Sequence, residues 1–407
     1  MSLTSIINSP KKNLNPEYLP FRDALYNLGI SKKDFSGDFH APLLVPYNCD
    51  RAEANLIGCA ADWVFRLLIA QKCGEYNFFE SDVLSAIREG DFPDVHNGKR
   101  YVFCNHYVDS LINLEQIFQD FIGSNACLSD ELLMGCLYIG IEEQWLRSHY
   151  EIHESRIKTP LSEKAYIDYK GIVSVFQNNF LNNVPADANV IFNPVFGDAS
   201  SCLGGADGDV IINNSIIDFK CSKNINLQHA SHSKQLAGYC ILNHAIPVHK
   251  INRMCIYSGR TGILHQYVID ATIDSKFRSI ANEIIMPLVD RYREDAEKKR
   301  ALSLRRGMIQ RYYDELISSD ETVKSLSLKI HEWDNQHPEI SHNYTSSKNR
   351  ENLSQLYSIM LSIDNNPLFW EDHEDLFSDN QDGVERCTFQ PKVRNGQYVE
   401  FKKKLSR

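Results

Sequence analysis

Apolar side chains recur at helical spacing in the first half of the chain. Between Ala52 and Lys72 they form one continuous stripe, as on the buried face of an amphipathic helix: Leu56, Ala60, Trp63, Val64 and Leu67. Similar spacing predicts helices at 109–122, 129–153 and 161–180. Residues 1–48 contain five prolines and predict an irregular lead-in.

The pattern changes from helices to strands after Pro185. Residues 206–219 predict a β-hairpin, because the apolar runs DVII and SIID flank a polar Asn-Asn pair. A helix at 229–244 and the strands NRMCIYSG and ILHQYVID follow, and residues 273–335 are helical again. This alternation predicts an α/β core, a mixed β-sheet flanked by helices, with helical N- and C-terminal segments.

The predicted domain organisation follows from these changes of pattern. We expect a mostly helical N-terminal region at 1–125 and a core at 126–272, with its motifs at 204–239. A helical C-terminal region at 273–370 and a charged tail at 371–407 complete the chain.

Charge and cysteine content restrict the class of protein. A net charge of −10 over 407 residues argues against a protein that coats nucleic acid through bulk charge, although a local basic groove remains compatible with it. Eleven cysteines without a CxxC pair indicate neither a disulfide framework nor a zinc ribbon. The sequence has no apolar run of signal-peptide or membrane-spanning length, so we expect a soluble cytoplasmic protein with no membrane partner.

The hairpin carries charged residues that its apolar character does not explain. Asp209 opens its first strand and Asp218 ends its second, so a two-residue turn brings both carboxylates to one edge of the sheet. Such carboxylates raise each other's pKa unless a cation neutralises them, and their oxygens suit Mg²⁺ or Mn²⁺. Lys220 projects from the same strand face as Asp218 and can stabilise the charge that develops on a phosphate.

The surroundings of this Asp-x-Lys tripeptide distinguish it from others in the chain. Asp168-Tyr-Lys170 and Glu297-Lys-Lys299 have the same pattern but no apolar hairpin with an upstream Asp. After the hairpin comes a predicted helix with Gln235 and Tyr239 at i and i+4, on one face that can lie beside the two carboxylates.

GGADGDVIINNSIIDFKCSK at 204–223, followed by QLAGY at 235–239, resembles the RecB-like branch of the PD-(D/E)xK nuclease superfamily. The similarity covers about residues 190–270. It implies a restriction-endonuclease-like core and a Mg²⁺- or Mn²⁺-dependent nuclease that acts on DNA. It also implies roles for single residues: Asp209, Asp218 and the backbone carbonyl of Phe219 as metal ligands, Lys220 as the catalytic lysine, and Gln235 and Tyr239 lining the site and contacting DNA.

Two of these assignments have alternatives. Asp207 lies on the same strand face as Asp209 and is the alternative first ligand, although we favour Asp209 because it directly begins the apolar strand. RecB-like enzymes also supply a histidine or an acidic residue from an upstream helix, often soon after a glycine. Here Asp62, four residues after Gly58, has this position as a candidate metal ligand, with Asp in place of His. Glu142 and Glu143 are rival candidates, and an ion pair between Asp62 and Arg66 is the alternative interpretation for Asp62.

The remaining motifs concern partners and competing functions. Gly98-Lys99 lacks the rest of a P-loop, so a helicase or ATPase would have to come from a partner protein. The late cysteines lack the pairing of the iron–sulfur clusters of some RecB-like relatives, and no such cluster is expected. The basic run at 291–311 is either a solvated helix face or a contact to a DNA backbone. His229 and His232, just before the helix with Gln235 and Tyr239, could approach phosphates, but we favour a capping or loop role for them.

Defence against foreign DNA and DNA processing are both compatible with a standalone nuclease. The competing interpretations are a non-catalytic nucleic-acid-binding or assembly protein on a nuclease fold, and a nuclease directed at RNA. A zinc hydrolase built on His149 and His153 is the most distant one, because HxExH places the glutamate out of register. The oligomeric state stays open.

Overall fold

The computed structural model of the protein divides the chain into two compact units, Met1–Tyr292 and Arg293–Arg407. It describes residues 3–79, 114–148 and 160–301, the single positions 321 and 325, and two strands near the C-terminus at 388–394 and 397–404. The first unit contains the hairpin and every element discussed with it below.

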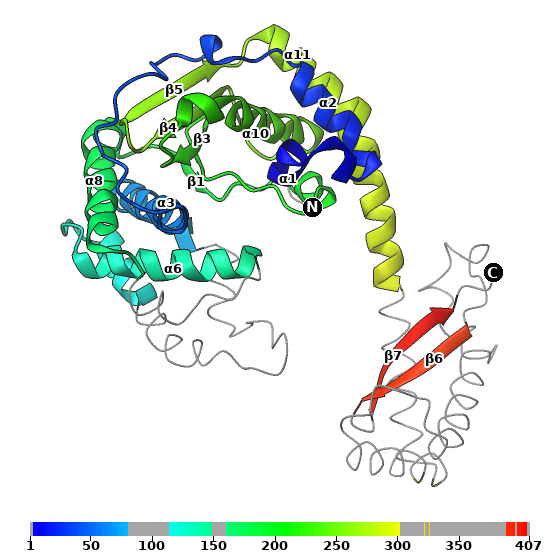
Figure 1. Ribbon diagram of the computed structural model, residues 1–407. Helices are drawn as coiled ribbons and strands as arrows, with labels where there is room; N and C mark the ends of the chain where they lie inside the picture. Colours follow the sequence, from blue (N-terminus) through cyan, green and yellow to red (C-terminus); the bar gives the residue numbers. More distant parts are fainter. Residues whose placement is uncertain are drawn as a thin grey trace. The chain divides into compact units, whose positions relative to one another are not determined.

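A five-stranded mixed sheet forms the centre of the first unit (Figure 1). Its strands lie in chain order: β1 (Val190–Phe192), β2 (Val210–Ile212), β3 (Ser215–Lys220), β4 (Arg253–Ser258) and β5 (Ile263–Val268). β3 is central, antiparallel to β2 and parallel to β4. The mixed sheet predicted from the sequence is therefore confirmed, while β1 was not predicted as a strand.

The hairpin has the predicted two-residue turn. Ile212 pairs with Ser215, so Asn213 and Asn214 form the turn. Asn213 has a φ of 53°, in the left-handed region that asparagine tolerates better than most residues. This turn fixes the register of β2 and β3 and so determines which residues of the two strands face each other.

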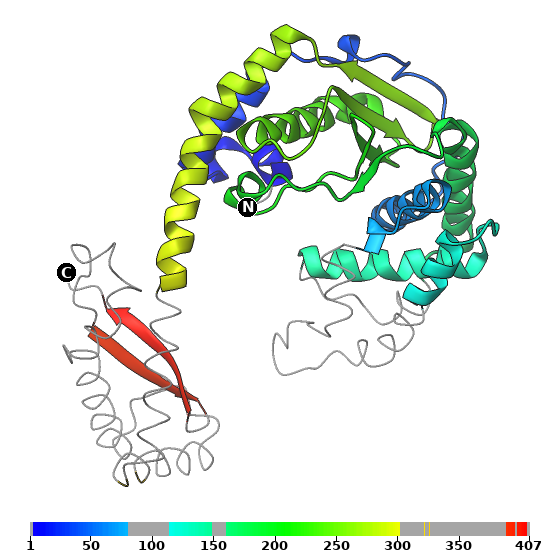
Figure 2. The same ribbon diagram turned by 180° about the vertical axis from the view of Figure 1, so that it is seen from behind.

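The two faces of the sheet are covered by different groups of helices (Figures 1 and 2). Alternation along β3 sends Ile217 and Phe219 to the core that contains α3, α6 and α8, and Ile216 to the core that contains α10. The helices of the first group are α3 (Arg51–Cys73), α6 (Asp130–Ser148) and α8 (Glu163–Asn179). The second group comprises α1 (Leu3–Asn8), α2 (Leu19–Asn27), α10 (Ile225–Ala245) and α11 (Ala271–Ile280).

The helices predicted from apolar spacing match the structure over its described residues. α3 begins at a capping box formed by Asp50 and Glu53 and ends at Gly74, which is left-handed with a φ of 64°. α6 and α8 lie within the predicted ranges 129–153 and 161–180, of which residues 149–153 are outside the described part. For the helix predicted at 109–122, the structure describes residues 114–122 as helical.

The N-terminal region departs from the predicted irregular lead-in, because it forms α1 and α2 despite its prolines. Pro20 lies in the first turn of α2, where a helix has no need of the missing N–H. Both helices pack on α10, and a Cβ at Gly238 would lie 2.9 Å from the side chain of Leu3. The following segment then runs beside β5, where the Ser36 amide donates to the Gln266 carbonyl at 2.8 Å.

Several shorter elements complete the described structure. α10 begins at Ile225 rather than at 229, so His229 and His232 lie inside this helix and not before it. α9 (Asp198–Cys202) precedes the hairpin, and a π-helical turn (Ala281–Ile285) continues α11 into helical residues 286–301. The 3-10 turns are Lys11–Asn13, Pro16–Tyr18, Lys32–Asp34, Asn77–Phe79 and Leu181–Asn183.

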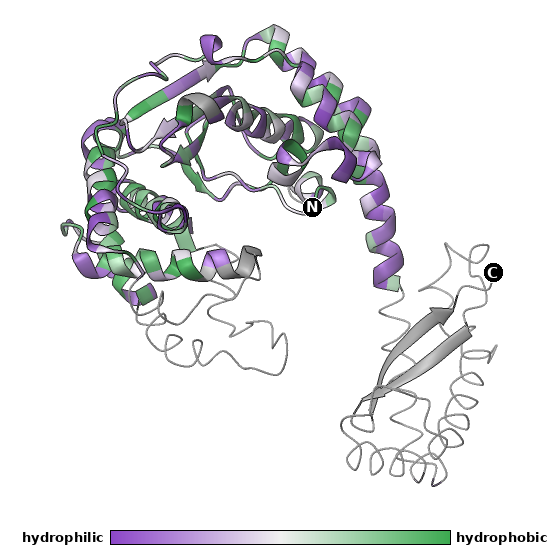
Figure 3. Cartoon of the chain, viewed as in Figure 1, coloured by the Kyte–Doolittle hydropathy of each residue, from purple (hydrophilic) through white to green (hydrophobic). Residues whose placement is uncertain are grey.

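The end of the long helix after α11 is hydrophilic, as its colouring shows (Figure 3). Residues 291–300 are all exposed to solvent. They are the first part of the basic run at 291–311, whose remaining residues lie outside the described range after Ala301.

In the second unit, the structure describes the antiparallel ribbon of β6 (Thr388–Arg394) and β7 (Gln397–Lys404), with an irregularity between Lys392 and Val393. Over the part of the chain that the structure describes, no helix combines the length and the apolar character needed to span a bilayer.

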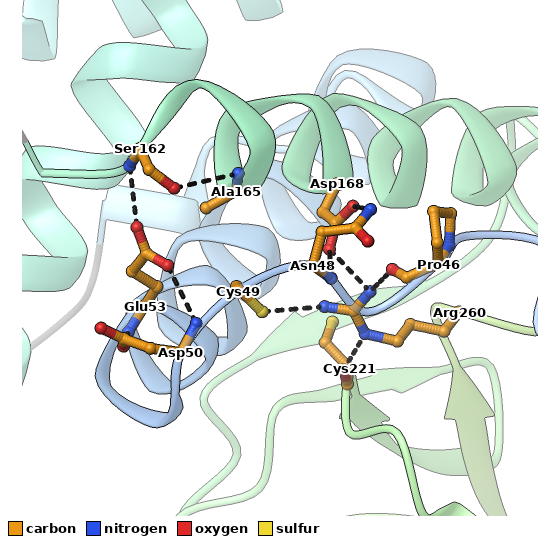
Figure 4. Close-up of polar contacts among 10 residues, drawn as sticks. All are labelled: Pro46, Asn48, Cys49, Asp50, Glu53, Ser162, Ala165, Asp168, Cys221 and Arg260. Atoms are coloured by element: carbon orange, nitrogen blue, oxygen red, sulfur yellow. Dashed lines mark hydrogen bonds and ion pairs between the residues drawn. The ribbon is translucent and has the colours of Figure 1, made fainter.

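A fully buried guanidinium ties four segments of the first unit together (Figure 4). Arg260, in the β4–β5 turn, donates to the carbonyl of Cys221 at 2.9 Å and to that of Pro46, and lies 3.5 Å from the Asp168 carboxylate of α8. Asp168 also accepts the Asn48 amide at 2.7 Å. Since Cys221 directly follows β3, this network holds the end of the central strand.

Arg260→Leu leaves Asp168 as a buried charge without its cation. We expect it to lower the free energy of unfolding by about 3–5 kcal/mol in urea denaturation. Adding Asp168→Leu should recover part of this loss, because the double variant no longer buries an unpaired charge. Lys170→Ala removes an exposed pair with Asp130 and an exposed contact with the Tyr166 ring, and it should leave the midpoint nearly unchanged. Equal midpoints for Arg260→Leu and Lys170→Ala would contradict the stabilising role of Arg260.

Candidate active site

Asp209 and Asp218 face each other where β2 begins and β3 ends. Val210 pairs with Ile217, so the register extended by one residue places Asp209 opposite Asp218. Asp209 Oδ2 accepts a hydrogen bond from the Phe219 amide at 2.6 Å, which holds this carboxylate against β3. The structure thus brings together the two carboxylates that the hairpin pattern predicted to converge.

Lys220 forms an ion pair with Asp218 on the same face of β3. Its Nζ lies 2.6 Å from Asp218 Oδ1, and the Asp218 side chain is only 2% exposed while that of Lys220 is 22% exposed. Burial by itself would lower the pKa of Lys220, but Asp218, Asp209 and Asp62 raise it to about 12. The lysine therefore carries a full positive charge at neutral pH, with one edge open to solvent.

α3 contributes a second charged cluster that reaches the same site. The buried Arg66 donates to Asp62 one helical turn earlier and to the side chain of Asn193 just after β1. Asn193 has a φ of 45°, and its amide donates to the Asp209 carbonyl at 3.2 Å. The Asp62–Arg66 pair expected in the alternative interpretation is thus present, and Asp62 also adds a small part to the raised pKa of Lys220.

Glu143 of α6 also belongs to this second cluster. It is buried and accepts a hydrogen bond from Trp63 Nε1 at 2.8 Å, and the Arg66 guanidinium lies over the Trp63 ring at 4.3 Å. Burial favours a lower pKa of Arg66, but Asp62, Glu143 and Asp209 together raise it. Arg66 therefore links carboxylates of both helices to the first strand of the hairpin.

α10 covers the site on the face of the sheet opposite to α3, α6 and α8. Tyr239 donates to the carbonyl of Asp207 at 2.6 Å and accepts a hydrogen bond from Gln235 Nε2 at 2.8 Å. Burial, followed by the charges of Asp218, Asp209 and Asp207, raises the pKa of Tyr239, which keeps its hydroxyl protonated. The Gln235 and Tyr239 pair thus lies beside the carboxylates, as its helical spacing suggested.

Four carboxylates and two cations meet at the site. Asp62, Glu143 and Asp209 act on Arg66, and Asp218, Asp209 and Asp62 act on Lys220. Among these carboxylates Asp218 is the most affected: burial raises its pKa, Lys220 opposes the rise, Asp209 adds to it, and the result is about 7. A divalent cation would relieve the repulsion between Asp209 and Asp218.

The donor atoms fit a hard cation such as Mg²⁺. Asp218 Oδ2 is buried and has no hydrogen-bond partner among the described residues. Mg²⁺ commonly uses one or two carboxylates and completes its octahedral shell with water and substrate phosphate. Within the described residues, no group of three or more His, Cys, Asp or Glu side chains is placed to hold a metal ion, so the candidate donors are the two carboxylates alone.

The remaining candidate site residues differ in what the structure describes of them. Asp207 lies near the site, and the described contact of its main chain is the hydrogen bond that its carbonyl accepts from Tyr239. Phe219 contributes its amide to Asp209, and the role predicted for its carbonyl stays a prediction. His149 and His153 lie outside the described residues, as does the side chain of Glu142.

Sequence reasoning missed Asn193 as a part of this site. Asn193 directly precedes Pro194 and follows an apolar run, VIF, which was the available signal for a strand that ends in a turn. It reaches the site through its contacts with Arg66 and with the Asp209 carbonyl. For His229 and His232, which lie inside α10, an approach to phosphates stays a prediction.

Comparisons of this chain with protein-family models, with curated proteins and with solved structures found no match.

The raised pKa of Asp218 makes stability depend on pH. The carboxyl of Asp218 has a pKa of about 7 in the folded protein and of 3.8, the ordinary value, in the unfolded chain. Its protonated form therefore adds fully to the free energy of unfolding below pH 3.8, and this stabilisation is lost as the pH rises through about 7. In EDTA, wild type should therefore lose stability relative to Asp218→Asn across this window. Urea denaturation at a series of pH values measures the difference, and a difference that stays constant would contradict the assignment.

Proposed function

We propose that this protein is a metal-dependent nuclease that hydrolyses phosphodiester bonds of DNA, on a core of the PD-(D/E)xK type. The observation that carries the proposal is the pairing of Asp209 with Asp218 at the end of the central strand, beside a charged Lys220. Two carboxylates with an unsatisfied buried oxygen and a neighbouring ammonium group are what cleavage of a phosphate ester with a hard cation requires.

Each residue of the chain has a distinct part in this proposal. Asp209 and Asp218 would hold the cation, which supplies Lewis-acid activation of water and phosphate when bound. The ammonium group of Lys220 stabilises the negative charge that develops on the phosphate oxygens. Tyr239 and Gln235 hold the strand before Asp209 through the Asp207 carbonyl, and so keep the first carboxylate in register.

The choice of DNA as substrate rests on the resemblance of 204–239 to RecB-like nucleases. The neighbouring carboxylates of Asp209 and Asp218 make direct phosphate binding unfavourable without a cation, because like charges repel. We therefore infer that binding of the cation and of the substrate are coupled. Defence against foreign DNA and DNA processing both remain compatible with this activity, and a partner ATPase would act outside this site.

Cleavage of linear, circular and single-stranded DNA, with matched RNA, is the direct test. With Mg²⁺ or Mn²⁺ we expect cleavage of DNA by wild type and a loss of at least about 100-fold in Asp209→Asn, Asp218→Asn and Lys220→Ala, because each removes a ligand or the charge that stabilises the transition state. Products from circular DNA would identify an endonuclease.

Lys170→Ala is the matched control, because Asp168-Tyr-Lys170 has the same tripeptide pattern but its lysine is an exposed residue of α8. It should cleave like wild type. Cleavage of RNA alone would redirect the proposal to an RNA nuclease. Binding of DNA without cleavage, unchanged by Asp209→Asn, would favour the non-catalytic alternative.

Mg²⁺ should also stabilise the folded protein, because it binds the carboxylates only when they converge. At pH 8 and a concentration 100-fold above Kd, the gain is about 2.7 kcal/mol, measured as a shift of the thermal midpoint. Asp218→Asn should abolish the shift, and Asp130→Asn, an exposed carboxylate of α6, should keep it. An equal shift in both variants would place the cation elsewhere.

A further inference from the structure

A tyrosine ring where α2 packs on α10 lies in contact with two cations. Cζ of Arg22, on α2, lies 4.6 Å from the centre of the Tyr26 ring, and Nζ of Lys234, on α10, lies 4.1 Å from the same centre. The Tyr26 hydroxyl donates to the Ile7 carbonyl of α1 at 3.2 Å, and the residue is 47% exposed. The ring is therefore tied to α1 and is still accessible to solvent.

The guanidinium of Arg22 is largely buried, but no described carboxylate accepts a hydrogen bond from it. The side chain is 13% exposed, and Nη1 lies 3.9 Å from Asp23 Oδ1, beyond hydrogen-bond distance. That carboxylate lies 2.7 Å from Lys11 Nζ instead. Nε of Arg22 has no hydrogen-bond partner among the described residues. By contrast, the buried guanidiniums of Arg66 and Arg260 donate hydrogen bonds to oxygen atoms of neighbouring segments.

Lys234 adds a second positive charge at the ring. Its Nζ donates to the Ala230 carbonyl, one turn earlier in α10, at 3.1 Å, and no carboxylate of the described residues forms an ion pair with it. An ammonium group has three N–H bonds, so two remain for a ligand. Burial and the charge of Arg22 lower the pKa of Lys234, which shows that the two cations repel each other.

α10 connects these cations to the candidate active site. Lys234 directly precedes Gln235, whose Nε2 donates to the Tyr239 hydroxyl at 2.8 Å, and Tyr239 donates to the Asp207 carbonyl at 2.6 Å. An α-helix rises by about 1.5 Å per residue, so Lys234 lies at the same level of the helix as the residues that border the hairpin.

We propose that Arg22 and Lys234 together bind a backbone phosphate of the nucleic acid, at a distance from the phosphodiester bond that is cleaved. This inference rests on the nuclease function proposed above and adds a second contact to the same substrate. The planar N–H fork of arginine and the point charge of lysine both suit phosphate oxygens. Tyr26 places the two cations before the strand arrives, and the bound anion relieves their repulsion.

The competing interpretation is that the two cation–π contacts only pack α2 against α10. Thermal denaturation separates the two interpretations. Packing predicts a lower midpoint for Lys234→Gln, whereas removal of the repulsion with Arg22 predicts a midpoint equal to or above that of wild type. Inorganic phosphate, compared with chloride at equal ionic strength, should raise the midpoint of wild type, and Lys234→Gln should lose most of this gain.

Binding of a labelled DNA duplex measures the proposed contact directly. The Asp218→Asn background in EDTA prevents metal-dependent cleavage and removes one of the two repelling carboxylates. In this background, Lys234→Gln should weaken binding about 3- to 10-fold and reduce the slope of log K against log salt by roughly 1, because one phosphate contact is lost. Lys170→Gln removes an equal charge from an exposed pair on α8, and it should leave the slope unchanged.

Cleavage kinetics give an independent readout. With Mg²⁺ and an otherwise wild-type chain, Lys234→Gln should raise KM by about the same 3- to 10-fold and leave kcat nearly unchanged, because the contact is equally strong before and in the transition state. Equal affinity and salt slope for Lys234→Gln and Lys170→Gln would overturn the inference. So would a gain of midpoint from phosphate that needs Lys234 without any effect on DNA binding, because the ligand would then be free phosphate.

The two proposals fail in different ways. If wild type cleaves DNA with Mg²⁺ and Lys234→Gln binds the duplex like Lys170→Gln, the phosphate contact is overturned and the nuclease function stands. If wild type neither cleaves nor gains thermal stability from Mg²⁺, the nuclease proposal is overturned. A reduced salt slope in Lys234→Gln would then assign Arg22 and Lys234 to nucleic-acid binding without cleavage.

Discussion

The buried guanidinium of Arg260 is the constraint on which the arrangement of the first unit depends. It connects the segment before α3, the Asp168 carboxylate of α8, the β4–β5 turn and the residue after β3. A charge in this position is tolerated only with partners on every side, and the partners come from three separate parts of the chain besides the turn that carries Arg260. The network therefore holds the end of β3 at a defined place, and Lys220 lies one residue before the bond to Cys221.

The candidate site buries charged side chains at an electrostatic cost that an apolar core does not have. Asp218 is almost fully buried beside Asp209, and its pKa of about 7 shows that Lys220 offsets only part of the unfavourable burial and repulsion. Arg66 and Asp62 bring further charge from α3. Apolar residues at the end of a central strand would give a more stable fold. The buried charges therefore favour a functional role for the residues that carry them.

α10 has a double role in this arrangement. Its buried side covers the sheet and supports α1 and α2, where Gly238 allows the close approach of Leu3. Another part of its surface brings Tyr239 and Gln235 to the hairpin, where Tyr239 donates to the Asp207 carbonyl. The helix therefore fixes the geometry of the site with the same contacts that bury its core residues, and the position of the site is coupled to the packing of the N-terminal helices.

The sequence by itself determined the hairpin, its two-residue turn and the convergence of Asp209 with Asp218, because strand alternation and turn length act between neighbouring residues. It likewise determined α3 and α8, whose apolar stripes repeat at helical spacing. The helical structure of the first 27 residues was missed, because tertiary packing on α10 outweighs the local signal of the prolines.

Only the tertiary structure decided which distant residues complete the site. Arg66 meets Asn193 across 127 residues, and Trp63 meets Glu143 across 80. Tyr239 meets the Asp207 carbonyl across 32 residues, and only once α10 is folded onto the sheet. Such contacts leave no periodic pattern in the sequence, because they depend on how elements pack and not on spacing along any one of them. The local chemistry of the hairpin is thus encoded in its own residues, while its electrostatic surroundings are a property of the whole fold.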